Sequence, residues 1–281
     1  MNKLSKRMSF FGIATLVWGV LLVISVVPFQ SLFSSLPEET ENLVPVVIPV
    51  CTENMDVSKV VKKNLHEEPR TVKSKTAPSF SQVELQMQNP ELPNGCEVTS
   101  LAMVLSAAGY PVDKLELYEY LPRASFSYSE NERLGPDPHQ AYAGSADSVS
   151  GGWYCLEGPI IEAGNSWIQE TKRNAQMSDL TGIDRDAMDN LLEKGIPLVV
   201  WVTQDYAPPT YAEYFPWTLS DGSQYVPYDN LHCVVVGGVE NEVYQIADPI
   251  RGWQQIEKEV FWESFDAMGC RAVTVRRDNI L

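Results

Sequence analysis

The sequence predicts an α+β domain that follows an apolar N-terminal segment. Three observations support this: an uncharged apolar run near the N-terminus, an early helical pattern over residues 98–108, and strand patterns that begin after residue 196. An early helix combined with a late set of antiparallel strands is typical of α+β folds. The chain has 281 residues, which is enough to bury one large core without disulfide bonds.

The composition is that of a globular protein with an acidic surface. Apolar residues make up 44% and charged residues 21%, and the formal net charge is −16. The one basic cluster, Lys3, Lys6 and Arg7, lies at the extreme N-terminus. Because so acidic a body repels phosphate backbones, we expect no nucleic-acid partner.

Residues 1–37 are predicted to be a membrane anchor or signal segment. Residues 8–37 contain no charged side chain, and the strongly apolar run 10–27 approaches the roughly 20 residues that cross a bilayer. The basic flank should stay in the cytoplasm, which places the acidic body outside. Residues 28–33 offer no small-residue cleavage site, which favours an uncleaved single-pass anchor over a secreted, processed chain.

The next two segments differ in composition. Residues 38–79 mix charge runs with Ser and Thr and contain few aromatic residues, which indicates a linker or stalk. Residues 80–281 carry the periodic apolar patterns of a folded domain. We therefore predict one globular domain that a stalk separates from the membrane.

Within this domain the apolar spacing predicts elements in order. The first is the helix over 98–108, for which Gly109 is the expected C-terminal cap. Further along, the patterns predict helices at 184–192 and 257–268, and strands at 197–203, 232–239, 242–246 and 271–275.

The segment around Cys96 is the most informative for chemistry. Pro93-Asn94-Gly95 is a turn signal, Asn94 suits a helix N-cap, and Glu97 three residues later completes a capping-box pattern. Cys96 then lies in the first helical turn, where free amides and the helix dipole stabilise a thiolate. Gly95 would leave room for a substrate backbone. The alternative is a buried structural cysteine.

A nucleophilic cysteine needs a base, and the chain has three histidines. His66 lies in the predicted linker and His139 in a Gly/Pro-rich loop, whereas His232 begins an apolar strand. Asp248 ends the next strand, sixteen residues on, and two adjacent antiparallel strands would bring both side chains to one end of the sheet. Asp248 could then fix the imidazole tautomer, or simply start a turn.

The five cysteines and the remaining motifs exclude several classes of protein. There is no C-x-x-C pair, no H-E-x-x-H zinc motif and no P-loop, so we expect no metal and no cofactor. Cys233 follows His232 on a strand, so it points to the opposite face and is predicted to be core. Cys155 and Cys270 could pair if the domain lies outside the cell.

The order Gln-x-Pro-Glu-Leu-Pro-x-Gly-Cys-Glu, then His-Cys-Val-Val, then Ala-Asp-Pro carries a resemblance. It resembles the bacteriocin-processing type of papain-like cysteine peptidase, in its stand-alone, non-transporter branch (peptidase C39-like), over roughly residues 80–281. The resemblance implies a papain-like fold, in which a helical half bears the cysteine, an antiparallel sheet half bears the histidine, and a cleft lies between them.

The resemblance also implies a role for each site residue. Cys96 would be the nucleophile, His232 the general base and acid, and Asp248 the residue that orients His232. Gln88 would donate to the oxyanion hole beside the Cys96 amide. Gln86 is a nearby competitor for that role, but the motif spacing favours Gln88.

The expected function is therefore that of an extracytoplasmic cysteine peptidase that cleaves amide bonds in a peptide or protein substrate. The chain lacks the transport and ATPase domains of transporter-linked members, so a double-glycine leader is not implied as substrate. Two alternatives stay open. One is a catalytically silent papain-like module that binds peptides. The other is an acyl transferase or transpeptidase that uses the same four residues.

Overall fold

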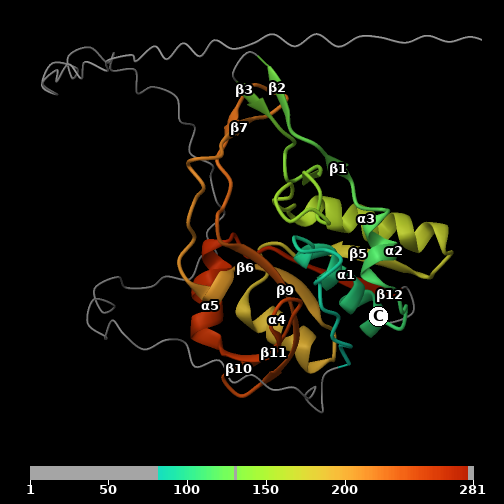
Figure 1. Cartoon of the computed structure of the whole chain (residues 1–281). Coiled ribbons are helices and arrows are strands. Elements are labelled where there is room, and N and C mark those ends of the chain that lie inside the picture. The colour runs from blue at the N-terminus through green and yellow to red at the C-terminus, as the bar shows by residue number, and fades with distance from the viewer. Residues whose placement is uncertain (1–81, 130–131, 278–281) are drawn as a thin grey trace, which may run out of the picture. The chain divides into compact units, whose positions relative to one another are not determined.

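The structure is a computed structural model that describes residues 82–129 and 132–277 (Figure 1). The predicted anchor at 1–37 and the predicted linker at 38–79 lie outside these residues, as does His66. Among the described residues, no helix has the length and apolar character needed to cross a bilayer.

A six-stranded antiparallel sheet forms the centre of the domain. Its strand order is β11-β10-β9-β6-β12-β5, and every neighbouring pair is antiparallel. The strands are β5 (Ala175–Asp179), β6 (Leu198–Thr203), β9 (Leu231–Glu240), β10 (Val243–Asp248), β11 (Gly252–Glu257) and β12 (Ala272–Arg277).

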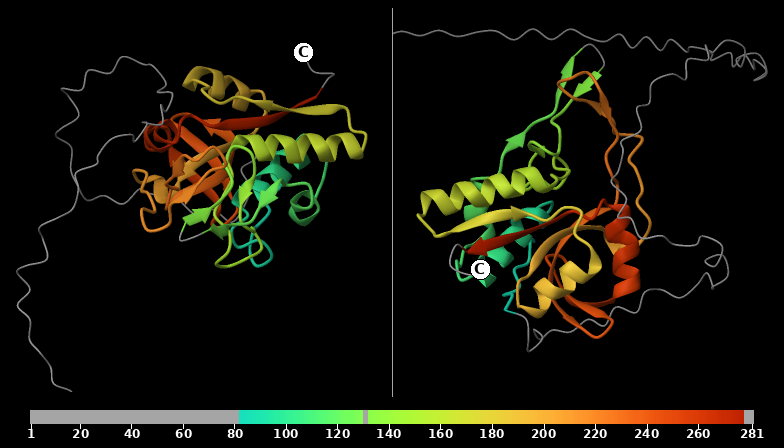
Figure 2. Two further views of the ribbon diagram at one scale, coloured as in Figure 1. Left: turned by 90° about the horizontal axis from the view of Figure 1, so that it is seen from above. Right: turned by 180° about the vertical axis from the view of Figure 1, so that it is seen from behind.

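Helices cover both faces of this sheet (Figure 2). Helices α1 (Cys96–Ala107) and α3 (Glu157–Glu170) pack on one face, and α2 (Lys114–Tyr118) rests on both of them. Helices α4 (Arg185–Glu193) and α5 (Lys258–Ala267) pack on the other face. This arrangement puts the N-terminus of α1 directly against the sheet.

The alternation of side chains along the strands explains this two-sided packing. In β6, Val199 and Trp201 point toward α1, whereas the even-numbered residues Leu198, Val200 and Val202 point toward α4 and α5. Successive side chains in a strand face opposite ways, so a strand that is apolar at every position has both faces covered. All six residues of β6 are buried, as its uninterrupted apolar run predicts.

A β-bulge in β9 sets the register that the candidate site depends on. Gln245 pairs with Gly238 but Ile246 pairs with Val236, so Gly237 is skipped. A one-residue shift moves every later side chain to the other face of the sheet. Asp248 therefore shares a face with the even-numbered residues of β9, and His232 is one of these.

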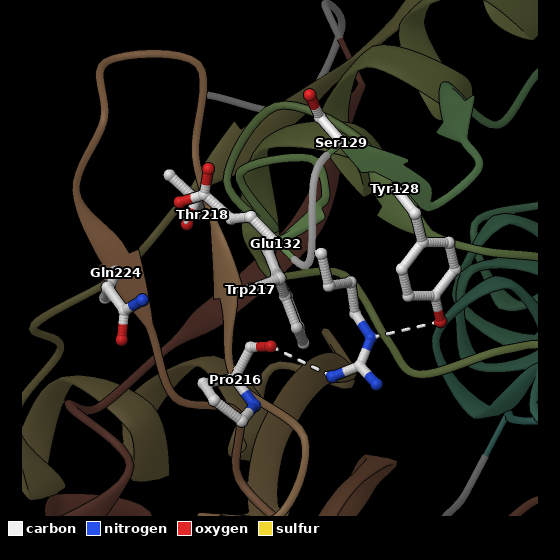
Figure 3. Close-up of a pocket in the computed structure, with 8 residues that line it drawn as sticks. Tyr128, Ser129, Glu132, Pro216, Trp217, Thr218 and Gln224 are labelled. Atoms are coloured by element: carbon white, nitrogen blue, oxygen red, sulfur yellow. Dashed lines mark hydrogen bonds between the residues drawn. The ribbon is translucent and has the colours of Figure 1, made fainter.

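A smaller four-stranded sheet, β2-β3-β7-β8, stands apart from the large sheet in Figure 1. Its strands are β2 (Ser127–Ser129), β3 (Glu132–Leu134), β7 (Trp217–Thr218) and β8 (Gln224–Tyr225). It borders an open pocket of about 640 Å³, in which Arg133 lies between Tyr128 and the Pro216 carbonyl (Figure 3). The pair β1 (Arg123–Ala124) and β4 (Tyr142–Ala143) is parallel.

The α+β class and the order of the predicted elements are confirmed. The predicted helices at 98–108, 184–192 and 257–268 correspond to α1, α4 and α5, and Gly109 adopts the positive φ of 86° expected just after a helix end. Sequence patterns did not predict α2, α3, β5, β11 or the small sheet. Most of these segments are short, and α3 carries Gly158, Pro159 and Gly164, residues that weaken a helical signal in a sequence.

The predicted capping box at the start of α1 is wrong. The N-cap is Gly95, no side chain caps the helix, and Asn94 instead donates through Nδ2 to the Ser148 carbonyl at 2.6 Å. The Glu97 carboxyl turns inward and accepts from the Cys155 amide at 3.0 Å. A partner 58 residues away replaces the local cap, and a local pattern cannot reveal such a partner.

The expected role of Gly95 is also corrected. A Cβ at Gly95 would lie 2.6 Å from Leu92 Cβ, so the space beside Gly95 is filled by the preceding loop and not left for a substrate. The glycine is needed because the chain turns back tightly on itself before α1.

We predict that Gly95→Ala destabilises the fold by about 1–3 kcal/mol, since the added methyl group meets a backbone-proximal carbon. Gly164→Ala in α3 is the matched control. There the added Cβ meets Met177 Cγ and Sδ at 2.6 and 2.7 Å, a flexible side chain that can move. Urea unfolding should show a clear loss of unfolding free energy for Gly95→Ala and almost no change for Gly164→Ala. The reverse order would contradict this packing.

Candidate active site

His232 and Asp248 form a buried pair on adjacent strands of the large sheet. His232 lies near the start of β9 and Asp248 at the end of β10. His232 Nε2 lies 3.0 Å from Asp248 Oδ1, and their side chains are 4% and 2% exposed. The structure thus brings together the two residues whose meeting the strand pairing predicts, with the bulge at Gly237 providing the shared face.

Asp248 is held as a carboxylate by several donors. Besides His232, Oδ1 accepts from the Ile250 and Arg251 amides at 2.7 and 3.1 Å, and Oδ2 accepts from Gln254 Nε2 at 3.3 Å. Burial opposes the charge, but the hydrogen bond and charge of His232 and the two amides outweigh it, so the pKa of Asp248 is lowered. A carboxylate at this position fixes the imidazole orientation.

Gln254 is a site residue that sequence reasoning missed. It lies on β11 and is 1% exposed, and its amide reaches Asp248 from the strand beyond β10. The only signal in the sequence is a pair of glutamines, Gln254 and Gln255, inside a strand-like segment. Recognising it requires knowing that β11 pairs with β10.

Gln88 lies beside the Asp248 turn. Its backbone N–H donates to the Pro249 carbonyl at 2.8 Å, and its side-chain Nε2 donates to the Pro93 carbonyl at 2.6 Å. It is 1% exposed, and its buried Oε1 has no hydrogen-bond partner among the residues that the structure describes. The competing residue, Gln86, instead donates to the Val112 carbonyl at 2.9 Å and so lies on the side of α2.

Cys96 is the first residue of α1 and packs against β9 at Cys233, the neighbour of His232 in the chain. Its thiol donates to Glu97 Oε2 at 3.3 Å, and among the described residues it has no hydrogen bond to His232. Burial and the nearby Glu97 charge raise the pKa of Cys96 well above its ordinary value. Both effects favour the thiol over the thiolate and so oppose the helix N-terminus, which the sequence analysis expects to stabilise a thiolate.

Glu97 is the other residue whose role the sequence did not reveal. It is 1% exposed, Oε2 accepts from Cys96, and Oε1 accepts from the Cys155 amide. Burial raises the pKa of Glu97 to about 7, although the hydrogen bonds that it accepts oppose the rise. Glu97 thus ties the start of α1 to the segment before α3.

The remaining candidate residues have structural positions. Cys155 and Cys233 are buried free thiols, so the possible pairing of Cys155 with Cys270 is wrong. His139 is partly exposed and lies 3.1 Å from Glu157 in the loop that the sequence predicts. In the part of the chain that the structure describes, no three His, Cys, Asp or Glu side chains gather as a metal site would require.

The comparisons with known proteins agree with this α+β fold. The sequence profile of the peptidase C39-like family matches residues 80–273. The chain belongs to this family. The match includes the segment with Gln88 and Cys96 as well as the strands that carry His232 and Asp248.

Two relatives show how far the similarity extends. The uncharacterized protein YvpB of Bacillus subtilis (strain 168) is 32% identical over 195 residues, which cover 68% of this chain and 73% of that protein. A crystal structure from Bacillus anthracis, provisionally described as a C39-like peptidase, is 28% identical with a TM-score of 0.60. That match covers 69% of this chain and 94% of the other. The stand-alone C39-like fold is therefore shown.

Glu157, at the start of α3, anchors the segment that carries Cys155. Arg271 donates to Glu157 Oε2 at 2.7 Å, and His139 lies at Oε1. Burial opposes ionisation, but His139 and Arg271 lower the pKa of Glu157 to about 2. The charged form thus contributes stability above the unfolded pKa of 4.5, and that contribution is lost as the pH falls through about 2.

We predict that Glu157→Gln lowers the free energy of unfolding by about 1–3 kcal/mol at pH 7, and that the difference shrinks below about pH 4.5. Urea unfolding at pH 7 and pH 3 measures both values. Glu259→Gln is the control, because Glu259 also pairs with an arginine, Arg185, but is 75% exposed. If both variants lose the same free energy of unfolding at pH 7, burial of the Glu157–Arg271 pair does not increase its contribution to stability.

Proposed function

We propose that this chain is a cysteine peptidase in which Cys96, His232, Asp248 and Gln88 carry out the cleavage of peptide bonds. The observation that carries the proposal is the buried His232–Asp248 pair at the end of the sheet, next to the strand residue against which Cys96 packs. Membership of the C39-like family supports the same reaction class.

The reaction begins with a movement of the sulfur. It requires Sγ of Cys96 to leave Glu97, by rotation about χ1 to another staggered conformer, and to reach His232, the neighbour of Cys233 in β9. Asp248 occupies Nε2 of His232, which leaves Nδ1 to take the thiol proton. The resulting thiolate attacks the substrate carbonyl, His232 protonates the leaving amine, and water then releases the acyl group.

Gln88 serves the oxyanion in this scheme. One N–H of its Nε2 is used by the Pro93 carbonyl, and a side-chain amide carries two N–H groups. The second N–H and the Cys96 amide, at the first position of α1, would bind the oxyanion together. The bond from its backbone N–H to the Pro249 carbonyl fixes the Gln88 backbone, and the bond from Nε2 to the Pro93 carbonyl fixes its side chain before substrate arrives.

A domain that binds peptides without cleaving them is the second candidate. The inward thiol, protonated and hydrogen-bonded to Glu97, favours it. The two candidates differ in whether the sulfur ever leaves Glu97 for His232, and so labelling and turnover experiments separate them.

We also propose that the catalytic domain works outside the cytoplasm, attached through residues 1–37. The basic flank at Lys3, Lys6 and Arg7 and the uncharged run that follows support this location. Added protease should degrade the domain in intact cells or spheroplasts, whereas protection of the domain from protease would contradict the proposal.

The first functional prediction concerns turnover. The full chain, incubated with a mixed-sequence peptide library, should generate new peptide termini that mass spectrometry detects, and Cys96→Ala should abolish them. Gln88→Ala should slow turnover by about a hundredfold or more, because one oxyanion donor is lost. Gln86→Ala is the matched control and should leave turnover unchanged, since Gln86 is bonded to Val112.

The second functional prediction concerns labelling by a peptidyl epoxide, which reports an activated thiol without a known substrate. The epoxide should label Cys96 alone among the three buried free thiols, and His232→Ala should suppress the labelling. His139→Ala removes an exposed histidine and should have no effect. Labelling that survives His232→Ala, together with no new peptide termini, would favour the binding module.

A further inference from the structure

Glu97 occupies an unusual position next to the sulfur of Cys96. Its carboxyl is almost completely buried in the first turn of α1, with Oε2 at 3.3 Å from Cys96 Sγ and Oε1 at 3.0 Å from the Cys155 amide. One oxygen therefore has a structural partner, and the other faces the proposed nucleophile. The peptidase mechanism above gives Glu97 no task.

The groups that face Glu97 do not neutralise a charge on it. From α1 comes the Cys96 thiol, from the segment before α3 the Cys155 thiol, and from β9 the Cys233 thiol. The Tyr142 hydroxyl on β4 also faces Glu97, and burial and the Glu97 charge raise the pKa of this phenol. Among the described residues, Glu97 has no salt bridge to Lys, Arg or His.

The thiol of Cys96 and the carboxyl of Glu97 carry one titratable proton each. Among the described residues no cation pairs with Glu97 to balance a negative charge there. If the carboxyl is ionised, it accepts from the thiol and holds the sulfur in its neutral form. If the carboxyl is protonated, it no longer binds the thiol hydrogen as a charged acceptor, and the sulfur is free to turn to His232. Two negative charges at this separation in a buried site repel strongly, so both groups are not ionised together.

We propose that Glu97 positions the Cys96 sulfur: the carboxylate accepts from the thiol and holds it in an unreactive form, and the carboxylic acid releases the sulfur to His232. The inference rests on the proposed peptidase function, to which it adds the control of the nucleophile. During turnover the proton of Cys96 passes to His232 while Glu97 keeps its own proton, so the balance of the peptidase reaction is unchanged.

This arrangement predicts that Cys96 is more reactive on the acidic side of neutrality than an ordinary thiol. Since burial raises the pKa of Glu97 to about 7, the carboxyl is protonated below that pH and ionised above it. Cys96 alkylation should rise up to about pH 7 and then stop rising, because Glu97 rather than Cys96 gives up the next proton.

The decisive comparison is wild type against Glu97→Gln, with the full chain treated with iodoacetamide and each cysteine quantified by mass spectrometry. Glutamine keeps an acceptor for the Cys155 amide, and because it cannot ionise it cannot hold the thiol as a carboxylate does. Glu97→Gln should raise the alkylation rate of Cys96 at least about tenfold at pH 8 and leave it within about threefold at pH 5.5. If the ratio of the Cys96 alkylation rates of Glu97→Gln and wild type is the same at both pH values, the proposal is overturned.

Matched controls separate this inference from the peptidase proposal. Glu157→Gln removes a half-buried glutamate close to Cys155, and it should leave the pH dependence of Cys96 alkylation unchanged. His232→Ala tests the base independently. If this variant leaves the alkylation rate of Cys96 unchanged, the peptidase proposal is contradicted, whatever the result for Glu97→Gln. If Glu97→Gln does not fold, the wild-type profile decides, since a rate that keeps rising from pH 7 to pH 9 contradicts the role of Glu97.

Discussion

Strand β9 is the constraint on which the candidate site depends. Its odd-numbered side chains pack against α1, and Ser100 of α1 hydrogen-bonds to the Cys233 carbonyl at 3.4 Å. Its bulge at Gly237 turns Asp248 of the neighbouring strand to the face that carries His232. One strand therefore places the histidine, its carboxylate partner and the helix that bears Cys96, so the site is assembled by the core of the sheet.

Burial of the N-terminus of α1 has a direct chemical consequence. Ten of the twelve residues of α1 are buried, including Cys96 and Glu97. A helix N-terminus at the surface would favour a thiolate, but here desolvation and a neighbouring carboxyl act against it. The effect of the helix dipole on Cys96 is thus outweighed locally, and in the proposed mechanism the reactivity of the thiol depends on whether Glu97 or His232 receives its hydrogen bond.

The sequence predicted much of the fold because its main elements have strong local signals. The apolar run of β6, the periodic spacing of α1 and the meeting of His232 with Asp248 all followed from periodicity and strand pairing. The failures share a physical cause, since each depends on a contact between distant segments. Asn94 bonds to Ser148, Glu97 bonds to Cys155, and Gln254 reaches Asp248 from a strand that the patterns did not show.

The central claim is that the sulfur of Cys96 moves from Glu97 to His232 when it reacts. A crystal structure of the full chain with a peptide aldehyde bound to Cys96 tests it directly, because the hemithioacetal resembles the tetrahedral intermediate. The account predicts Sγ turned away from Glu97, the hemithioacetal hydroxyl near Gln88 Nε2, and His232 Nδ1 within hydrogen-bonding distance of the adduct. An adduct whose sulfur still contacts Glu97, with His232 bonded only to Asp248, would contradict it.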